Sequence, residues 1–155
     1  MDDVVPSTFT LDRQLCFALT SASRAISNCY RPFLEQIGLT YTQYVVMLVL
    51  WEHRSVSQSY LNDCTQLDSG TLSPLLKRLQ NRGLISRQRA EQDERTVQIS
   101  LTPAGAALWE DAFHAQARVE GATGLAPDEL ARLRDELKAL SLRLRTAHTG
   151  SPTTH

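Results

Sequence analysis

The stretch from residue 69 to residue 101 constrains the fold more than any other part of the chain. Four leucines recur there at helical spacing and predict one buried helix face: Leu72, Leu75, Leu76 and Leu79. Gly83 stands where a residue of left-handed conformation commonly ends a helix. Residues 85–89 and 96–101 then alternate as strands, with a turn at 91–94 between them. The sequence therefore predicts an amphipathic helix that leads directly into a two-stranded ribbon.

The charge of the chain is concentrated in the same stretch. The formal net charge is −1, but residues 69–100 carry +3, whereas residues 1–68 carry −3 and residues 101–155 carry −1. Residues 69–90 hold five cations and no acid: Lys77, Arg78, Arg82, Arg87 and Arg89. A basic patch on a nearly neutral chain indicates that one face contacts a polyanion.

Helical patterns flank this stretch on both sides. We expect helices over residues 11–30, from about Thr42 to His53, from Ser57 to about Thr65, from Pro103 to about Val119, and from Pro127 onward. The apolar run from Tyr44 to Trp51 also fits a buried strand, but its continuation into Glu52 and His53 without a turn favours a helix. The predicted fold class is mainly α with a small two-stranded β wing, as in a winged helix-turn-helix. We expect one domain over 1–155, with the winged helix-turn-helix at 42–101 and a disordered tail at 149–155.

Composition excludes several other classes of protein. The longest apolar run is far shorter than the roughly 20 residues of a membrane helix, and the acidic start lacks a signal peptide, so we expect a cytoplasmic protein without membrane contact. The three cysteines form no C-x-x-C pair, and the four histidines are scattered, so no metal site is predicted. Phosphate-loop and hydrolase motifs are absent from the sequence, and we expect neither an enzyme nor a bound cofactor.

The helix at about 70–82 is the candidate for reading DNA. Small and hydroxyl residues at its start would let it enter a major groove, and its basic residues would reach phosphates. The candidate contacts are Ser69, Gly70, Thr71, Ser73, Pro74, Lys77 and Arg78. The ribbon adds Arg87, Arg89 and Arg95, and a basic hairpin can insert an arginine into the minor groove. The alternative is an ordinary amphipathic helix facing solvent.

Residues 67–105, LDSGTLSPLLKRLQNRGLISRQRAEQDERTVQISLTPAG, resemble the recognition helix and wing of MarR-family transcription regulators. The resemblance implies that Arg95 enters the minor groove and that Asp93 orients it. It also implies a homodimer formed by terminal dimerisation helices at 10–38 and 103–147. A two-fold protein of this kind binds a near-palindromic operator in double-stranded DNA.

Cys16 is the candidate reactive thiol. Its helical angle places it about 100° from the apolar stripe of its helix, and Arg13 and Arg24 lie nearby in the sequence. Cys29 falls on the stripe and Cys64 follows Leu61 by three residues, so we expect both to be small core residues. Core packing is also the alternative for Cys16.

The segments LDRQLCFALTSASRA and LTYTQYVVMLVLWEH resemble the organic-hydroperoxide-resistance repressors, a subgroup of the MarR family. The resemblance implies that Cys16 senses peroxide and that Tyr30 and Tyr41 hold its thiolate across the dimer. Thr20 stands where the subgroup usually has a third tyrosine. Because no cysteine follows Cys64, a small cellular thiol is expected to resolve the oxidised Cys16, with Cys29 or Cys64 as the alternative.

The predicted function is a repressor that releases its operator when an organic hydroperoxide oxidises Cys16. Three alternatives stay open. One is a MarR-type repressor released by a small aromatic or other ligand, without a redox role for Cys16. The others are a thiol peroxidase that uses Cys16 and a helical module whose basic face binds an acidic protein.

Overall fold

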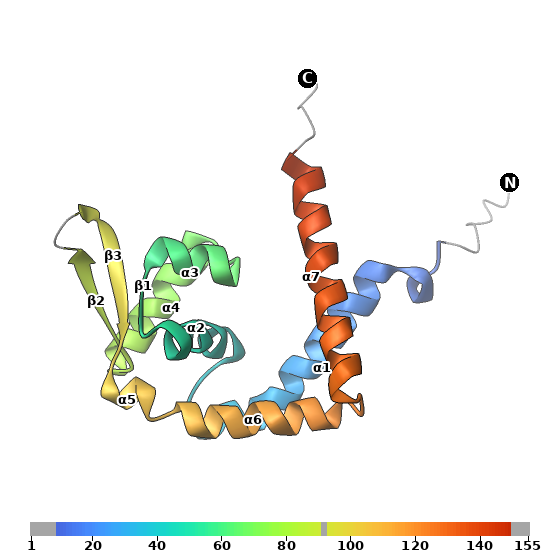
Figure 1. The fold of residues 1–155 in the computed structure, drawn as a ribbon, viewed down its shortest axis with the longest axis horizontal. Helices are drawn as coiled ribbons and strands as arrows, with labels where there is room; N and C mark the ends of the chain where they lie inside the picture. The colour runs from blue at the N-terminus through green and yellow to red at the C-terminus, as the bar shows by residue number, and fades with distance from the viewer. Residues whose placement is uncertain (1–8, 91–92, 150–155) are drawn as a thin grey trace, which may run out of the picture. The chain divides into compact units, whose positions relative to one another are not determined.

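The computed structural model describes residues 9–90 and 93–149, and the chain forms two compact units, Met1–Gln116 and Ala117–His155 (Figure 1). The elements follow in the order η1 (Leu11–Arg13), α1 (Leu15–Gln36), α2 (Tyr41–His53), β1 (Ser55–Ser57), α3 (Gln58–Thr65), α4 (Ser69–Asn81), β2 (Ile85–Ala90), β3 (Asp93–Leu101), α5 (Pro103–Ala106), α6 (Trp109–Ala122) and α7 (Pro127–Thr149). The prediction of a mainly helical winged fold is confirmed.

The sheet has three antiparallel strands, one more than the sequence predicted. Its order is β1-β3-β2, and β1 adds to the outer side of β3 through the pairs Ser55 with Ser100 and Val56 with Ile99. Three residues are too few to show an alternating pattern, which is why the sequence did not reveal β1. Val56 and Ile99 are both buried, so this short strand closes one edge of the core.

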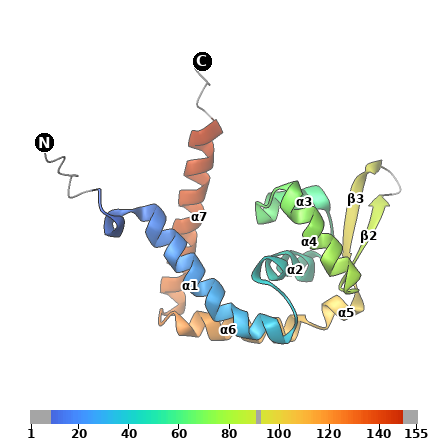
Figure 2. The same ribbon diagram turned by 180° about the vertical axis from the view of Figure 1, so that it is seen from behind.

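The core lies among α2, α3, α4 and the sheet, which stand side by side in both ribbon views (Figures 1 and 2). The predicted stripe of α4 is confirmed, because all four of its leucines are buried. They meet fully buried residues of the neighbouring elements: Val46, Met47, Leu50, Leu61, Ile85 and Ile99. Burial of this apolar stripe fixes which face of α4 points outward.

Side-chain caps set the starts of these helices. Ser57, the predicted start of the short helix, caps α3, whereas α2 is capped by Thr40, two residues before its predicted start at Thr42. Thr40 accepts a hydrogen bond from the Gln43 backbone N–H, and the Gln43 side chain accepts one from the Thr40 N–H at 3.0 Å. This reciprocal pair is a capping box, which satisfies two N–H groups at once and moves the start of the helix to Tyr41.

Helix α1 departs from its predicted limits at both ends. It begins at Leu15, after the 3-10 turn η1, and continues through Pro32 to Gln36 instead of ending near Tyr30. Gly38, at φ +68°, closes the turn after it. The Arg82 guanidinium donates to the carbonyl of Ile37 at 3.1 Å and to that of Gly38, so a cation satisfies the carbonyls at the end of α1.

The helix predicted over residues 103–119 is divided into α5 and α6. The Trp51 indole N–H donates to the Gly105 carbonyl at 2.9 Å, and the Leu108 N–H donates to the same oxygen at 3.3 Å. In a continuous α-helix this carbonyl would accept from residue 109. The tighter turn at Leu108, together with the hydrogen bond from Trp51, therefore separates the two helices.

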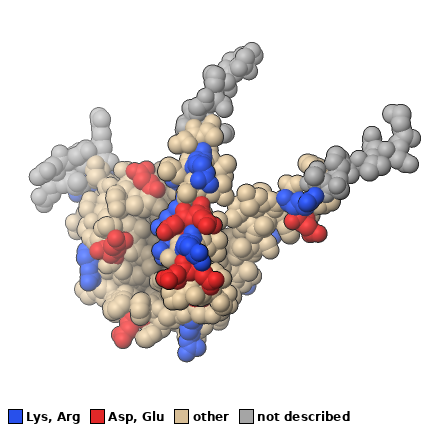
Figure 3. Space-filling view, turned by 45° about the vertical axis from the view of Figure 1, so that its right-hand side comes forward, with Lys and Arg blue, Asp and Glu red and all other residues tan. Residues whose placement is uncertain are grey.

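Helix α7 belongs to the second unit and begins at Pro127 as predicted. It runs through Thr149, so the expected start of the disordered tail at 149 is wrong, and residues 150–155 lie outside the described residues. Acidic and basic side chains lie next to one another on the face of the molecule in Figure 3. On α7, Arg134 Nε lies 3.6 Å from Asp135 Oδ1. Among the described residues, no single helix is long and apolar enough to cross a membrane; α1 and α2 meet that test only together, bent by 74°.

Candidate nucleic-acid interface and thiol site

The outward face of α4 carries the predicted candidates from its first residues onward. Asp68 caps the helix: its carboxylate accepts from the Thr71 N–H at 2.8 Å and from the Thr71 hydroxyl at 2.9 Å. These hydrogen bonds hold the pKa of Asp68 below its ordinary value. Ser73 is half-buried, and the other candidates on α4 are exposed: Ser69, Gly70, Thr71, Pro74, Lys77 and Arg78.

The start of α2 lies beside this face. Thr40, Thr42 and Gln43 line a hollow of about 320 Å³ together with Gly70, Thr71, Pro74, Leu75 and Arg78 of α4. Two helix starts and a guanidinium therefore face one depression. The N–H groups of Thr40, Gln43 and Thr71 are occupied by the caps, but the exposed guanidinium of Arg78 is suited to an anionic group such as a phosphate.

The cations of the basic stretch differ in what they contact. Lys77, Arg78 and Arg89 are exposed, whereas Arg82 is engaged at the end of α1. Arg87 is half-buried, and its Nη2 donates to Gln58 Oε1 at 3.5 Å. The sequence did not single out Gln58, because a glutamine in the first turn of a short helix carries no pattern.

The wing tip holds the remaining predicted contacts. The backbone of Asp93 and Arg95 lies in β3, and Ala90 pairs with Asp93 after an irregularity in the register at Arg89 and Ala90. The side chains of Asp93 and Arg95, like residues 91–92, lie outside the described part of the structure. Their predicted roles remain predictions.

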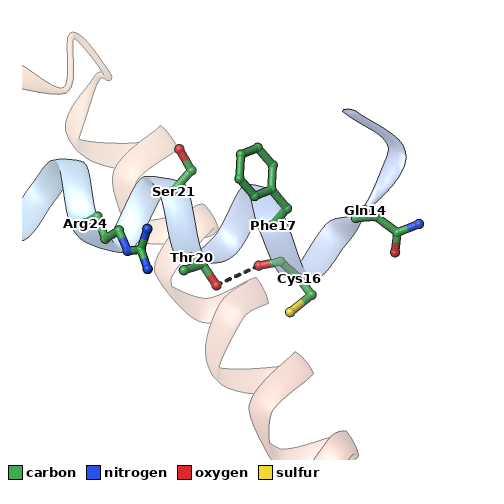
Figure 4. A pocket seen from close by; sticks show the side chains of 6 residues that line it. All are labelled: Gln14, Cys16, Phe17, Thr20, Ser21 and Arg24. Carbon is green, nitrogen blue, oxygen red and sulfur yellow. Dashed lines mark hydrogen bonds between the residues drawn. The ribbon is translucent and has the colours of Figure 1, made fainter. Parts of the chain in front are cut away.

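Cys16 is exposed near the start of α1. It lines a hollow of about 520 Å³ with Gln14, Phe17, Thr20, Ser21 and Arg24 (Figure 4). Cys16, Thr20 and Arg24 lie on one side of the helix, while Phe17 and Ser21 point to the opposite side in this view. The Thr20 hydroxyl donates to the Cys16 carbonyl at 2.9 Å, so its hydrogen is directed to the backbone and not to the sulfur.

The two predicted tyrosines lie together in a different place. The rings of Tyr30 and Tyr41 have centroids 5.5 Å apart, and Tyr44 lies 5.2 Å from Tyr30 and 6.0 Å from Tyr41. Tyr30 is buried, whereas Tyr41 remains 39% exposed. None of the three is among the residues that line the Cys16 hollow. The single chain thus brings Tyr30 and Tyr41 together but does not bring them to the thiol.

Cys29 and Cys64 are exposed, so their predicted core placement is wrong. The apolar stripe of α1 that carries Cys29 is itself largely uncovered in the single chain, with Leu15 60% and Ile26 42% exposed. On α3 only Leu61 is buried, because one turn of a short helix reaches the core. The neighbouring Cys64 raises the pKa of the Tyr60 phenol, with smaller contributions from burial and Glu52, and the Tyr60 hydroxyl lies 3.2 Å from His53 Nε2.

A further hollow of about 300 Å³ lies at the end of α1. Its lining combines apolar and polar groups from α1 and the start of α2: Ser27, Arg31, Leu34, Glu35, Leu39, Thr40 and Tyr41. A cation, a carboxylate and an aromatic ring around one concave surface can bind a small polar molecule. This hollow is separate from the one at Cys16.

Comparisons with known proteins agree with the fold. A family model described as transcriptional regulator SarA/Rot matches residues 28–111, more than half of the chain. The organic hydroperoxide resistance transcriptional regulator of Bacillus subtilis (strain 168) is 41% identical over 138 residues, which are 89% of this chain and 92% of the relative.

Solved structures extend the comparison. Reduced AbfR of Staphylococcus epidermidis bound to DNA is 35% identical, with a TM-score of 0.73 over 86% of this chain and 94% of that chain. Bordetella bronchiseptica BpsR, whose DNA binding is regulated by 6-hydroxynicotinic acid, is 25% identical, with a TM-score of 0.78 over 86% of this chain and 96% of that chain. One of these relatives is described by its redox state and the other by a small ligand.

Proposed function

Because the chain belongs to the MarR-type winged-helix transcriptional regulators, which include the SarA/Rot group, and is a DNA-binding protein, we propose that it is a repressor released by organic hydroperoxides. In this proposal reduced protein binds its operator, and oxidation of Cys16 ends the binding. The observation that carries the proposal is the exposed Cys16 in an open hollow beside Arg24, in a chain 41% identical to an organic hydroperoxide resistance regulator.

On the DNA, α4 is the reading element. Its exposed start would enter the major groove, with Lys77 and Arg78 on phosphates and Arg89 of the wing on the neighbouring backbone. Arg95 would enter the minor groove with Asp93 beside it. The partner is double-stranded operator DNA of near-palindromic sequence, and the proposed compartment is the cytoplasm.

A second copy of the chain completes the functional unit. Large apolar side chains are exposed just before η1, on η1 and α1 and, separately, on α7: Phe9, Leu11, Leu15 and Phe17, and Leu133, Leu137, Leu142 and Leu144. Exposed apolar stripes of this size are typical of surfaces that pair. A homodimer through the terminal helices would cover them and would place Tyr30 and Tyr41 of one protomer nearer the thiol of its partner.

The sensing chemistry is a two-step oxidation. The Cys16 thiolate attacks the outer peroxide oxygen, the O–O bond breaks, and the alkoxide takes a proton and leaves as an alcohol. The resulting sulfenic acid condenses with a small cellular thiol, which forms a mixed disulfide and releases water. Cys16 is the second residue of α1 and is exposed, so a peroxide can reach its sulfur. Arg24 adds a cation on the same face.

Release of DNA by peroxide tests the proposal. A labelled duplex taken from upstream of this gene is titrated with reduced protein, and fluorescence anisotropy is followed after stoichiometric tert-butyl hydroperoxide and glutathione are added. We expect the anisotropy to fall to the value of free DNA and to recover with dithiothreitol. An anisotropy that stays unchanged after peroxide is added would refute the redox part of the proposal and leave DNA binding intact.

The hollow at Ser27, Arg31 and Tyr41 favours a second candidate, a regulator released by a small aromatic acid. Its cation suits a carboxylate and its tyrosine suits a ring. BpsR, a relative in fold, is regulated by such a molecule. Addition of 6-hydroxynicotinic acid to the same duplex complex tests this candidate. Release by the acid with wild type, but not with Arg31→Ala, would favour it over peroxide sensing.

A further inference from the structure

A series of side-chain hydrogen bonds connects the wing to α4. Arg87 on β2 donates from Nη2 to Gln58 Oε1 at 3.5 Å, and Gln58 Nε2 donates to Ser73 Oγ at 3.2 Å. The three residues come from three different elements, and all are half-buried at the base of the exposed face of α4. Gln58 lies between the other two residues and contacts both Arg87 and Ser73.

The chemistry of Arg87 fixes the direction of each hydrogen bond. A guanidinium only donates, so the Gln58 amide must present its oxygen to Arg87 and its nitrogen to Ser73. The Ser73 oxygen therefore accepts, and its hydroxyl hydrogen remains for an acceptor outside this set. The Arg87 Nε is buried and has no hydrogen-bond partner among the described residues, so the contact to Gln58 is made through Nη2.

We propose that Gln58 is a positioning residue for sequence recognition: through the contacts Arg87–Gln58–Ser73 it makes the Ser73 hydroxyl a hydrogen-bond donor toward the DNA. The inference rests on the proposed placement of α4 in the major groove. In that groove guanine, adenine N7 and thymine O4 accept hydrogen bonds, whereas cytosine offers a donor amine. The base opposite Ser73 is therefore an acceptor, and cytosine is disfavoured there. Arg87, in turn, supports Gln58 instead of serving as a free phosphate contact.

The test first defines the site and then separates sequence reading from general binding. Wild-type protein selects duplexes from a randomised pool, and dissociation constants are measured by anisotropy on the selected duplex and on a scrambled duplex of equal composition. Gln58→Met keeps the length of the side chain and removes the amide. We expect it to weaken the selected duplex about tenfold, as for the loss of one hydrogen bond in a buried setting, with the scrambled duplex changed less than twofold.

A charge variant distinguishes a directed contact from a merely structural one. In Gln58→Glu the carboxylate still accepts from Arg87, but toward Ser73 it can only accept, so the hydroxyl turns away from the DNA. Ser59→Glu is the matched control, because it adds the same charge at the exposed neighbouring position. We expect Gln58→Glu to lose preference at the same base position as Ser73→Ala, and Ser59→Glu to weaken both duplexes equally.

The double variant Gln58→Met with Ser73→Ala should bind the selected duplex no more weakly than Ser73→Ala alone. Additive losses, equal weakening of both duplexes by Gln58→Met, or an unchanged base preference in Ser73→Ala would each overturn the inference while leaving DNA recognition in place. Wild-type protein that selects no sequence at all would overturn the placement of α4 as well. Circular dichroism of each variant confirms that the fold is kept, and Gln58→Glu decides the question if Gln58→Met unfolds.

Discussion

Two cations that follow α4 in the sequence each have a hydrogen-bond partner that sequence patterns do not show. Arg82 and Arg87 belong to the same run of cations as Lys77 and Arg89. Arg82, however, donates to the Ile37 carbonyl after α1, and Arg87 donates to the Gln58 side chain. Spacing along the chain predicts which face of a helix is buried, but it does not predict which charged groups find partners from distant elements.

At Asp68 the structure predicts a pH dependence of stability. The hydrogen bonds from Thr71 lower the pKa of this carboxyl below its ordinary value of 3.8, so the charged form stabilises the folded state. That stability is present above the unfolded pKa and is lost as the pH falls through the lower folded value. Thermal unfolding should therefore show Asp68→Asn less stable than wild type at pH 7, with the difference shrinking below about pH 4. A difference that stays constant down to pH 2 would contradict this reading.

At the scale of elements, the sequence predicted the recognition helix and ribbon closely and the connections around them less well. The α4 stripe and the Gly83 stop are local signals, and both are confirmed. The Thr40 capping box is also local, since it joins Thr40 to Gln43, but the predicted helix start was Thr42. β1 and the break between α5 and α6 instead depend on partners far along the chain, such as Ser100 for Ser55 and Gly105 for Trp51. Local periodicity carries no information about those partners.

The candidate site shows the same division between local and long-range signals. The sequence placed Cys16 away from the apolar stripe of its helix and left core packing open, and the structure shows it exposed. The gathering of Tyr30 and Tyr41 with Tyr44, and the contact of Gln58 with Ser73, arise only when separate elements pack. The sequence pointed to Tyr30 and Tyr41 through resemblance alone, and their role toward the thiol remains a prediction.

The junction at Gly105 should be among the positions most sensitive to a single methyl group. A Cβ at this buried glycine would overlap the Leu84 carbonyl oxygen and approach Leu101 Cδ1 to 2.9 Å. Gly105→Ala should lower the free energy of unfolding by about 1–3 kcal/mol, measured by urea denaturation. Gly121→Ala is the matched control in α6, where a Cβ meets nothing within 4 Å. It should raise stability by about 0.5–1 kcal/mol; equal effects of the two changes would argue against a tight junction.

The wing and the turn after α1 provide a second matched pair. Arg89 is exposed on β2, so Arg89→Gln should weaken binding to all duplexes and reduce the slope of log affinity against log salt by about one. Arg82→Gln removes the contacts to Ile37 and Gly38 and should lower the melting temperature without changing that slope. Salt titrations by anisotropy and thermal scans measure both effects. A reduced salt slope in Arg82→Gln would place that cation on the DNA.

For the whole molecule, the apolar residues left uncovered on the terminal helices predict a dimer. Leu15 on α1 is 60% exposed and Leu137 on α7 is 39% exposed. A charge at either position would have to be buried in the pair, so Leu15→Glu and Leu137→Glu should shift the mass seen by light scattering from dimer toward monomer. Tyr60→Glu, at a 40% exposed ring on α3, is the control and should leave the dimer intact. A monomeric wild type would refute the proposed assembly.

The most direct test of the account is the response of the DNA complex to peroxide when single cysteines are replaced. Anisotropy on the upstream duplex is measured for wild type, Cys16→Ser, Cys29→Ser and Cys64→Ser, before and after stoichiometric tert-butyl hydroperoxide with glutathione. The three thiols are all exposed, so accessibility alone does not favour one of them. We predict that every protein except Cys16→Ser releases the DNA. We also predict that intact-protein mass spectrometry shows one glutathione on each released chain. Release by Cys16→Ser, or retention by Cys29→Ser or Cys64→Ser, would contradict the assignment of Cys16 as the sensor.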